Sequence, residues 1–201
     1  MYDRNEGHNM RDITEKGILD LLPEYPLYKK IDTIGKYTAT MEEDVSLLVK
    51  LGLAIAAQNV LEIGTFLGET TIILAKYFSY VHTIDLEPMI KHIGKIYDLE
   101  QEYKFKESNI TSIMGDSSQL NTYNNVQHLP IHLSFIDGSH SYQNAITDTF
   151  HAMRLMENGI IVFHDIVSWT EVRIALNDLS KVMDIYHVVG IGVENIAFTI
   201  L

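Results

Sequence analysis

The feature that most constrains this chain is a regular alternation of short apolar runs and helical patterns, which begins after Asn59. Five apolar runs have the length of strands and cover residues 60–64, 81–85, 111–116, 131–137 and 160–165. Helical patterns follow from about residue 69, from Pro88, over residues 142–157 and over residues 170–181, with Asn158-Gly159 as the expected helix stop. Strands that are apolar throughout and alternate with helices predict a parallel sheet covered on both faces.

Both ends of the chain add to this unit. Residues 185–201 hold two β-rich runs joined by a Gly-x-Gly turn, which predicts a hairpin that contributes an antiparallel strand. Residues 12–26 indicate a short helix closed by Pro23 and Pro26. Residues 40–58 indicate a stronger helix, in which Thr40 and Glu43 have the spacing of a capping box. We therefore expect an α/β domain over residues 40–201, preceded by a helical extension over residues 1–39.

Composition limits the class of function. The chain has 27 acidic and 15 basic side chains and a net charge of −12, so its surface repels phosphate backbones and we expect no nucleic-acid partner. It has no cysteine, which excludes disulfides, thiolate nucleophiles and zinc–thiolate sites. The first residues are polar and no apolar run is long enough to span a bilayer, so we expect a soluble, cytoplasmic protein without a membrane partner.

The first strand and the loop after it have the composition of a ligand site. Glu62 lies late in the strand, and Gly64 and Gly68 allow the backbone to turn tightly and approach a ligand. Phe66 stands where the dinucleotide fingerprint G-x-G-x-x-G needs a glycine, so that fingerprint is absent. Asp85 ends the second strand, where an acid accepts hydrogen bonds from ribose hydroxyls. The order of these residues predicts a nucleoside site, and the alternative for Asp85 is a solvent-facing helix cap.

Acids also end the fourth and fifth strands. Asp137 follows one strand and His164 and Asp165 end the other, and neighbouring strands lie about 4.8 Å apart. Two carboxylates in a partly dry cleft repel each other, and neither motif contains a lysine or arginine. A divalent cation with oxygen ligands, magnesium or manganese, would balance them. His140 follows Asp137 by three residues, and its side chain is suited to proton abstraction near neutral pH.

Four segments in order, VLEIGTFLGETT, HTIDLEP, MGDSS and FIDGSHSY…GIIVFHD, resemble the class I S-adenosylmethionine-dependent methyltransferases. More narrowly, they are similar to the small O-methyltransferases of the macrocin and catechol type. The resemblance covers about residue 40 to the C-terminus. It implies a doubly wound, mostly parallel, Rossmann-like sheet of seven strands with the last strand antiparallel, and S-adenosylmethionine as the cofactor.

The resemblance also implies roles for particular residues. Glu62 would face the methionine end of the cofactor, and Thr70 would hydrogen-bond its carboxylate. Asp85 would hold the ribose with Leu86 beside the adenine, and the acid and first serine of MGDSS would contact the adenine edge. The implied cofactor-binding residues are Glu62, Gly64, Thr65, Phe66, Gly68, Thr70, Asp85, Leu86, Asp116, Ser117 and Asp137. Asp116 and Ser117 also suit a simple helix N-cap.

In metal-dependent relatives an acid ends the fourth strand and an acid pair ends the fifth, which implies Asp137, His164 and Asp165 as metal ligands here. His164 departs from that pattern because it stands where the first acid of the pair is usual. Imidazole favours manganese, iron, nickel or zinc over magnesium. His140 lies where relatives have a catalytic base. The alternatives are acids that serve as polar scaffolding, an unligated core histidine at position 164, and a helix-capping or supporting histidine at position 140.

These observations predict an O-methyltransferase that acts on a hydroxyl of a small molecule. The metal would bind the acceptor hydroxyl and His140 would remove its proton. Trp169 would either line the acceptor pocket or lie under a loop, and residues 1–39 would form either a lid over the acceptor site or a homo-oligomer contact. The alternative is a catalytically silent protein of the same fold that binds the cofactor. A nicotinamide-dependent dehydrogenase is disfavoured because G-x-G-x-x-G is missing.

Overall fold

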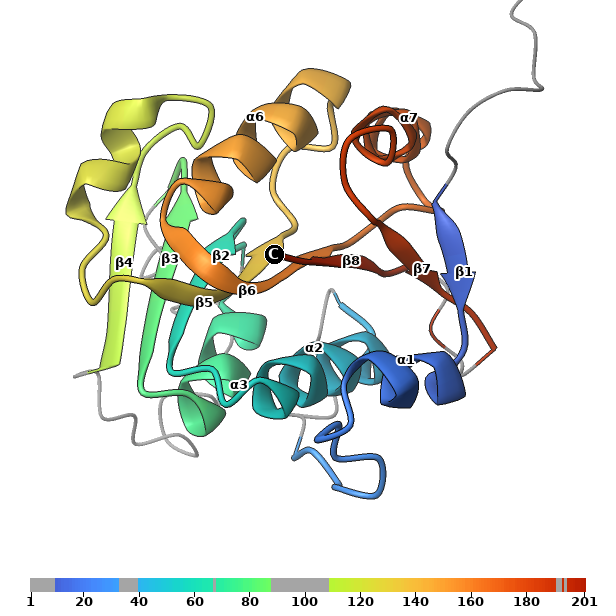
Figure 1. The fold of residues 1–201 in the computed structure, drawn as a ribbon. Coiled ribbons are helices and arrows are strands. Elements are labelled where there is room, and N and C mark those ends of the chain that lie inside the picture. Colours follow the sequence, from blue (N-terminus) through green and yellow to red (C-terminus); the bar gives the residue numbers. More distant parts are fainter. Residues whose placement is uncertain (1–9, 33–39, 67, 88–108, 191–192, 194) are drawn as a thin grey trace, which may run out of the picture.

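The computed structural model describes residues 10–32, 40–66, 68–87, 109–190, 193 and 195–201. Within them a single mixed sheet has the strand order β1-β7-β8-β6-β5-β2-β3-β4 (Figure 1). The strands are β1 Arg11–Ile13, β2 Asn59–Ile63, β3 Tyr80–Asp85, β4 Ile110–Met114, β5 Ile131–Ile136, β6 Met156–Phe163, β7 Tyr186–Val188 and β8 Ala197–Ile200. β8 is antiparallel to both of its neighbours, and the other pairs are parallel. The doubly wound, Rossmann-like fold is therefore confirmed, with β1 as an eighth strand at the edge.

Helices cover both faces of the sheet (Figure 1). On one face lie α1 (Glu15–Leu21), α2 (Glu42–Ala54) and α3 (Glu69–Tyr77), and on the other lie α6 (Tyr142–Met153) and α7 (Thr170–Leu179). Successive side chains of a strand point to opposite faces. In β2, Val60 joins the buried cluster that includes Leu48 of α2, whereas Leu61 joins the cluster that includes Leu176 of α7. The apolar strands are thus buried from both sides, as their composition predicts.

The N-terminal residues are part of this core. β1 pairs in parallel with β7, and Oδ1 of Asp12 lies 2.9 Å from Nδ1 of His187. Ile13 and Ile18 are buried in the same apolar cluster as α2. The predicted helix over residues 12–26 is therefore shorter at its start, because residues 11–13 form a strand. Residues 1–9 and 33–39 lie outside the described residues, so the lid or oligomer contact stays a prediction.

Two helix boundaries differ from those expected. Asn158-Gly159 is not a helix stop, because α6 ends at Met153 and both residues belong to β6. Gly159 has a φ of 151°, and a Cβ atom there would stand 2.2 Å from the carbonyl oxygen of His132. The glycine therefore serves a close approach of β6 to β5, where the register of the pair shifts between Ile131 and Leu133.

The expected capping box of α2 is also wrong. The N-cap residue is Met41, no side chain caps this end of the helix, and Thr40 is buried. The helix expected after Pro88 lies outside the described residues. Over the part of the chain that the structure describes, every helix is too short or too polar to cross a bilayer.

Candidate functional site

The carboxyl ends of the central strands open into one cleft of about 470 Å³. This volume lies in the usual range for small-molecule sites. A smaller hollow of about 40 Å³ shares Gly64, Phe66 and Asp137 with it and is also lined by Thr65 and Thr70. Glu62 and Gly68 line neither space. The predicted residues that line the main cleft are Gly64, Phe66, Asp85, Leu86, Asp116, Ser117, Asp137, His140, His164 and Asp165.

The loop after β2 is held by the carboxylate of Asp85. The backbone N–H groups of Thr65 and Phe66 both donate to Oδ2 of Asp85, at 2.8 and 2.9 Å. Phe66 has a φ of 46°, and its exposed side chain lines the cleft. Gly64 has a φ of 96°, and a Cβ atom there would stand 2.1 Å from the carbonyl oxygen of Asp137. Only glycine fits this position, because both the backbone angle and the close approach exclude a side chain.

Glu62 is connected to the same loop through the hydroxyl of Thr83. Its side chain is fully buried, and Oε2 accepts hydrogen bonds from the hydroxyls of Thr71 and of Thr83, the latter at 2.6 Å. The hydroxyl of Thr83 also lies 2.5 Å from that of Thr65 in the loop. Burial raises the pKa of Glu62 to about 8, against the effect of the two hydrogen bonds. A buried carboxyl group with a raised pKa therefore anchors this end of the site.

Asp116 and Ser117 lie in a turn after β4 that is tied to η2 (Leu120–Asn125), the helical turn that follows. Oδ1 of Asp116 accepts a hydrogen bond from the N–H of Ser118 at 2.9 Å, and hydrogen bonds from the side chain and the backbone of Ser118 lower the pKa of Asp116. The hydroxyl of Tyr123 donates to the carbonyl oxygen of Ser117 at 2.9 Å. The N-cap residue of η2 is Gln119, so Asp116 and Ser117 do not cap it.

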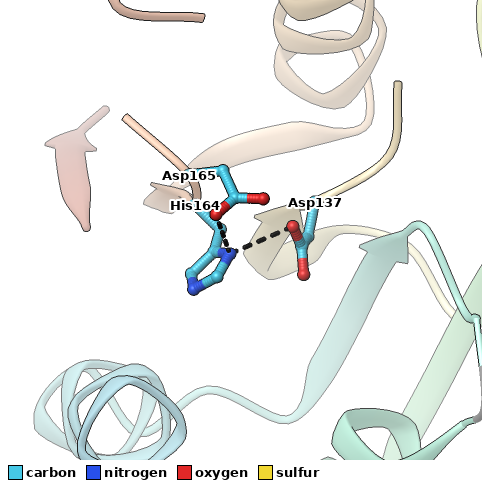
Figure 2. A group of neighbouring side chains, drawn as sticks. All are labelled: Asp137, His164 and Asp165. Carbon is cyan, nitrogen blue, oxygen red and sulfur yellow. Dashed lines mark hydrogen bonds and ion pairs between the residues drawn. The ribbon is translucent and has the colours of Figure 1, made fainter. Parts of the chain in front are cut away.

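Three predicted ligand residues converge where β5 and β6 end (Figure 2). Ile136 and Phe163 are paired across these strands, so Asp137 and His164 follow at the same level of the sheet. Nδ1 of His164 lies 3.1 Å from Oδ1 of Asp137 and 3.5 Å from Oδ1 of Asp165. One ligand atom from each residue lies within 4.8 Å of the others. The two carboxylates and the imidazole thus surround one point.

The opposite ring nitrogen of His164 contacts a carboxylate that the sequence motifs did not indicate. Nε2 of His164 lies 3.0 Å from Oδ2 of Asp44, and both side chains are buried. Burial opposes the charged form of the ring, but the hydrogen bonds to Asp137 and Asp44 outweigh it and raise the pKa of His164 to about 10. Burial also opposes ionisation of Asp137, yet the contacts with His140 and His164 hold the pKa of its carboxyl below the ordinary value. The site therefore favours a positive charge among its acids.

His140 lies beside this cluster, between an acid and an aromatic ring. Its Nε2 atom is 2.9 Å from Oδ2 of Asp165 and 3.8 Å from Oδ1 of Asp137. The imidazole stacks on the indole of Trp169, with ring centroids 4.7 Å apart and planes 5° from parallel. The contact with Asp137 and the charge of Asp165 raise the pKa of His140. The ring is therefore held in one plane at the edge of the cleft.

Asp165 adopts an unusual backbone conformation, with a φ of 61°. Its Oδ1 atom accepts a hydrogen bond from the side-chain amide of Asn195 at 2.7 Å. The amide oxygen of Asn195 in turn accepts from the N–H of Val167 at 2.9 Å. This bridge fixes the loop after β6, since strained conformations persist only where their surroundings hold them.

Sequence reasoning missed Asp44 and Asn195. Asp44 is the third acid in a row at the start of α2, a pattern typical of a solvated first helical turn. Asn195 lies between the two strands of the C-terminal hairpin and belongs to no motif. Neither residue carries a local signal, because each is brought to the site only by tertiary packing.

Comparison with known proteins identifies the family of this domain. A family model described as a methyltransferase domain matches residues 61–166, more than half of the chain. An O-methyltransferase from Bacillus cereus in complex with SAH is 19% identical, with a TM-score of 0.62 and coverage of 92% of this chain and 90% of that one. TomG, an O-methyltransferase from Streptomyces achromogenes solved in complex with SAM, is also 19% identical, with a TM-score of 0.63 and coverage of 81% of both chains.

A third structure, the SAH-bound methyltransferase PaMTH1 from Podospora anserina, is 13% identical, with a TM-score of 0.59 and coverage of 79% of this chain and 78% of that one. At these identities the likeness to solved structures shows the fold alone. No curated protein sequence matches the chain well enough to count as a relative. The family match is decisive, and the chain belongs to the S-adenosylmethionine-dependent methyltransferase family.

Proposed function

We propose that this protein is an O-methyltransferase that uses S-adenosylmethionine to methylate a hydroxyl of a small molecule. The observation that carries the proposal is that one cleft contains two complementary halves. The first half has the Asp85-anchored loop and the turn at Asp116 and Ser117, and the second has Asp137, His164 and Asp165 with His140 beside them. A cofactor and an acceptor at the two halves would meet within the same space.

The cofactor half suits S-adenosylmethionine. When bound, the cofactor supplies a methyl group on a positively charged sulfur, and a cleft rich in carboxylates favours that charge. Thr70 and the loop after β2 would hold the methionine end, and Glu62 would keep the loop in place from below. Asp85 would accept hydrogen bonds from the ribose, with Leu86 and the turn at residues 116–117 around the adenine.

The acceptor half suits a divalent cation held by Asp137, Nδ1 of His164 and Asp165. The donor set supports this assignment, because two carboxylate oxygens and one imidazole nitrogen converge in a site that favours positive charge. A bound cation would orient the acceptor hydroxyl and lower its pKa. The nitrogen donor favours manganese over magnesium.

His140 is the proposed general base. Its Nε2 atom faces the carboxylates at the end of the cleft, so a hydroxyl held there would come within its reach. Asp165 would stabilise the imidazolium that forms when His140 takes the proton. The stack on Trp169 would keep the ring oriented. Methyl transfer would then depend mainly on the positioning of the two reactants.

The test is an acceptor screen with catechols, simple phenols, sugars and polyketide hydroxyls, in which release of S-adenosylhomocysteine is measured. Turnover of at least one hydroxylated compound is the expected result. S-adenosylmethionine binding in calorimetry without turnover of any acceptor would instead support the catalytically silent alternative.

Metal removal tests the cation. Exhaustive chelation should abolish methyl transfer and leave S-adenosylmethionine binding nearly unchanged, because the cation serves the acceptor. Manganese should restore more activity than magnesium. Full activity after chelation, with no metal in elemental analysis, would remove the cation from the proposal and leave His140 as the sole base.

A further inference from the structure

We infer that Asp44 is a positioning residue that fixes which nitrogen of His164 faces the two carboxylates at the ends of β5 and β6. The inference rests on the proposed function for its consequence, cation binding, but not for its geometry. Asp44 does not line the cleft, so it would act only through His164.

The contact is short and shielded from solvent. Oδ2 of Asp44 lies 3.0 Å from Nε2 of His164, and the two side chains are 2% and 6% exposed. Phe135 packs against the ring with its centroid 5.9 Å away in an edge-on arrangement. The imidazole is therefore held by a carboxylate on one edge and an aromatic ring on one side, which leaves little room for it to flip.

The carboxylates on the two edges of the His164 ring indicate where its protons lie. Asp44 lies in the first turn of α2, where the helix dipole stabilises a negative charge. Carboxylates accept hydrogen bonds, so Nε2 of His164 donates to Asp44 and Nδ1 donates to Asp137. A cation held by Asp137 and Asp165 would displace the proton of Nδ1 and leave that of Nε2. Nδ1 is then the nitrogen that faces Asp137 and Asp165. A histidine that ligates a metal commonly donates its other N–H to a carboxylate, which orients the ring and increases its basicity.

This arrangement also explains how a histidine is accommodated among acids in the core. Asp137 is 27 residues away along the chain, whereas Asp44 is 120 residues away and comes from a helix on one face of the sheet. Asp44 thus connects the first helix of the predicted methyltransferase domain to the ends of β5 and β6.

The experiment uses the full chain and manganese chloride as the probe. Asp44→Ala removes the acceptor, Asp44→Asn keeps the shape without the charge, and Glu43→Gln is the matched control on the exposed side of the same helical turn. Calorimetry should show that Asp44→Ala weakens manganese binding by about 10–100-fold. Asp44→Asn should lie between Asp44→Ala and the wild type, and Glu43→Gln should bind like the wild type.

A double-mutant cycle separates positioning from a structural role. In a His164→Asp background there is no ring to orient, so Asp44→Ala should no longer weaken manganese binding. An equal loss in both backgrounds would overturn the inference, because Asp44 would then act through the fold alone.

A spectroscopic measurement does not require the cation. In ¹⁵N-histidine spectra the wild type should show a slowly exchanging, hydrogen-bonded Nε2–H signal, assigned to His164 by its loss in His164→Gln. Asp44→Ala should abolish this signal, and its persistence would overturn the inference. If the wild type binds no manganese, the cation in the proposed function is wrong, and this signal alone decides the role of Asp44.

Discussion

The two halves of the cleft are built from the same kind of side chain, the carboxylate, in two different ways. In the cofactor half, Asp85 accepts two backbone N–H groups and Glu62 accepts two hydroxyls, and these partners lie between 9 and 21 residues away in the sequence. In the acceptor half, Asp44 and Asp137 face opposite edges of a histidine ring, at separations of 120 and 27 residues. The carboxyl groups of the cofactor half are paired with neutral donors that are near in the sequence. Those of the acceptor half are paired with a histidine that is more distant in the sequence.

The difference separates binding from chemistry. Carboxyl groups that accept hydrogen bonds from nearby backbone N–H groups and hydroxyls give a stable shape that a ligand can occupy. Carboxylates that face imidazoles are ready to exchange a proton or a cation, because each charge there depends on its neighbours. We therefore expect substitutions in the cofactor half to change affinity or stability, and those in the acceptor half to change turnover.

The largest expected effect is on turnover. His140→Ala should lower the rate of methyl transfer by roughly 10²–10⁴-fold, the usual contribution of a general base. S-adenosylmethionine affinity in calorimetry should change little. Gln143→Ala, exposed on α6 three residues further on, is the matched control and should turn over like the wild type. A His140→Ala variant that keeps its turnover but loses its affinity for the cofactor would contradict the assignment of His140 to the acceptor half.

The second prediction concerns the point where the two halves meet. Gly64→Ala should lower the free energy of unfolding by about 3 kcal/mol or more. The added Cβ atom would collide with the Asp137 carbonyl, and the alanine would have to adopt a left-handed φ. Gly190 has a φ of 82°, and a Cβ atom added there would meet nothing within 4 Å. Gly190→Ala therefore measures the backbone strain alone and should lower the free energy of unfolding by about 1–2 kcal/mol. Equal losses in denaturant unfolding would show that the contact at Asp137 contributes nothing.

The same contrast explains what the sequence could predict. The strands, the Asp85 position and the meeting of Asp137 with His164 follow from local patterns and from one rule, that parallel strands end at the same edge of a sheet. β1 was missed because three residues carry no periodicity, and the helix stop at Asn158-Gly159 was wrong because the glycine serves a close strand approach. Asp44 and Asn195 have no local signal, since only tertiary contacts give them partners.

The third prediction tests the cofactor half directly. Asp85→Ala should weaken S-adenosylmethionine binding by about 1.5–3 kcal/mol, because it removes a charged acceptor from the loop amides and, in the proposed site, from the ribose. Turnover at saturating cofactor should fall much less. Asp20→Ala, exposed on α1, is the control for loss of one surface charge. Unchanged affinity in calorimetry, with the fold intact by circular dichroism, would contradict the role of Asp85.

The smallest expected effect comes from a second buried histidine, in the strand that ends at Asp85. His82 in β3 is 1% exposed, and burial, with the nearby charge of His128, lowers its pKa below the ordinary 6.5. The direction is opposite to that of His164, because among the described residues no carboxylate forms a hydrogen bond or ion pair with the His82 ring. Between the folded-state pKa and pH 6.5, the unfolded chain binds a proton at His82 that the folded chain does not. The free energy of unfolding therefore falls as the pH is lowered through this interval.

The slope from this single proton cannot exceed about 1.4 kcal/mol per pH unit. His82→Phe should therefore flatten the fall in unfolding free energy between pH 6.5 and the lowered pKa of the folded state. At about pH 8 the ring is neutral in both states, so any difference there measures packing alone and serves as the baseline. Denaturant unfolding across this range checks the prediction. Identical pH slopes in the two proteins would mean that His82 is charged inside the fold, and the contrast between the two buried histidines would then be lost.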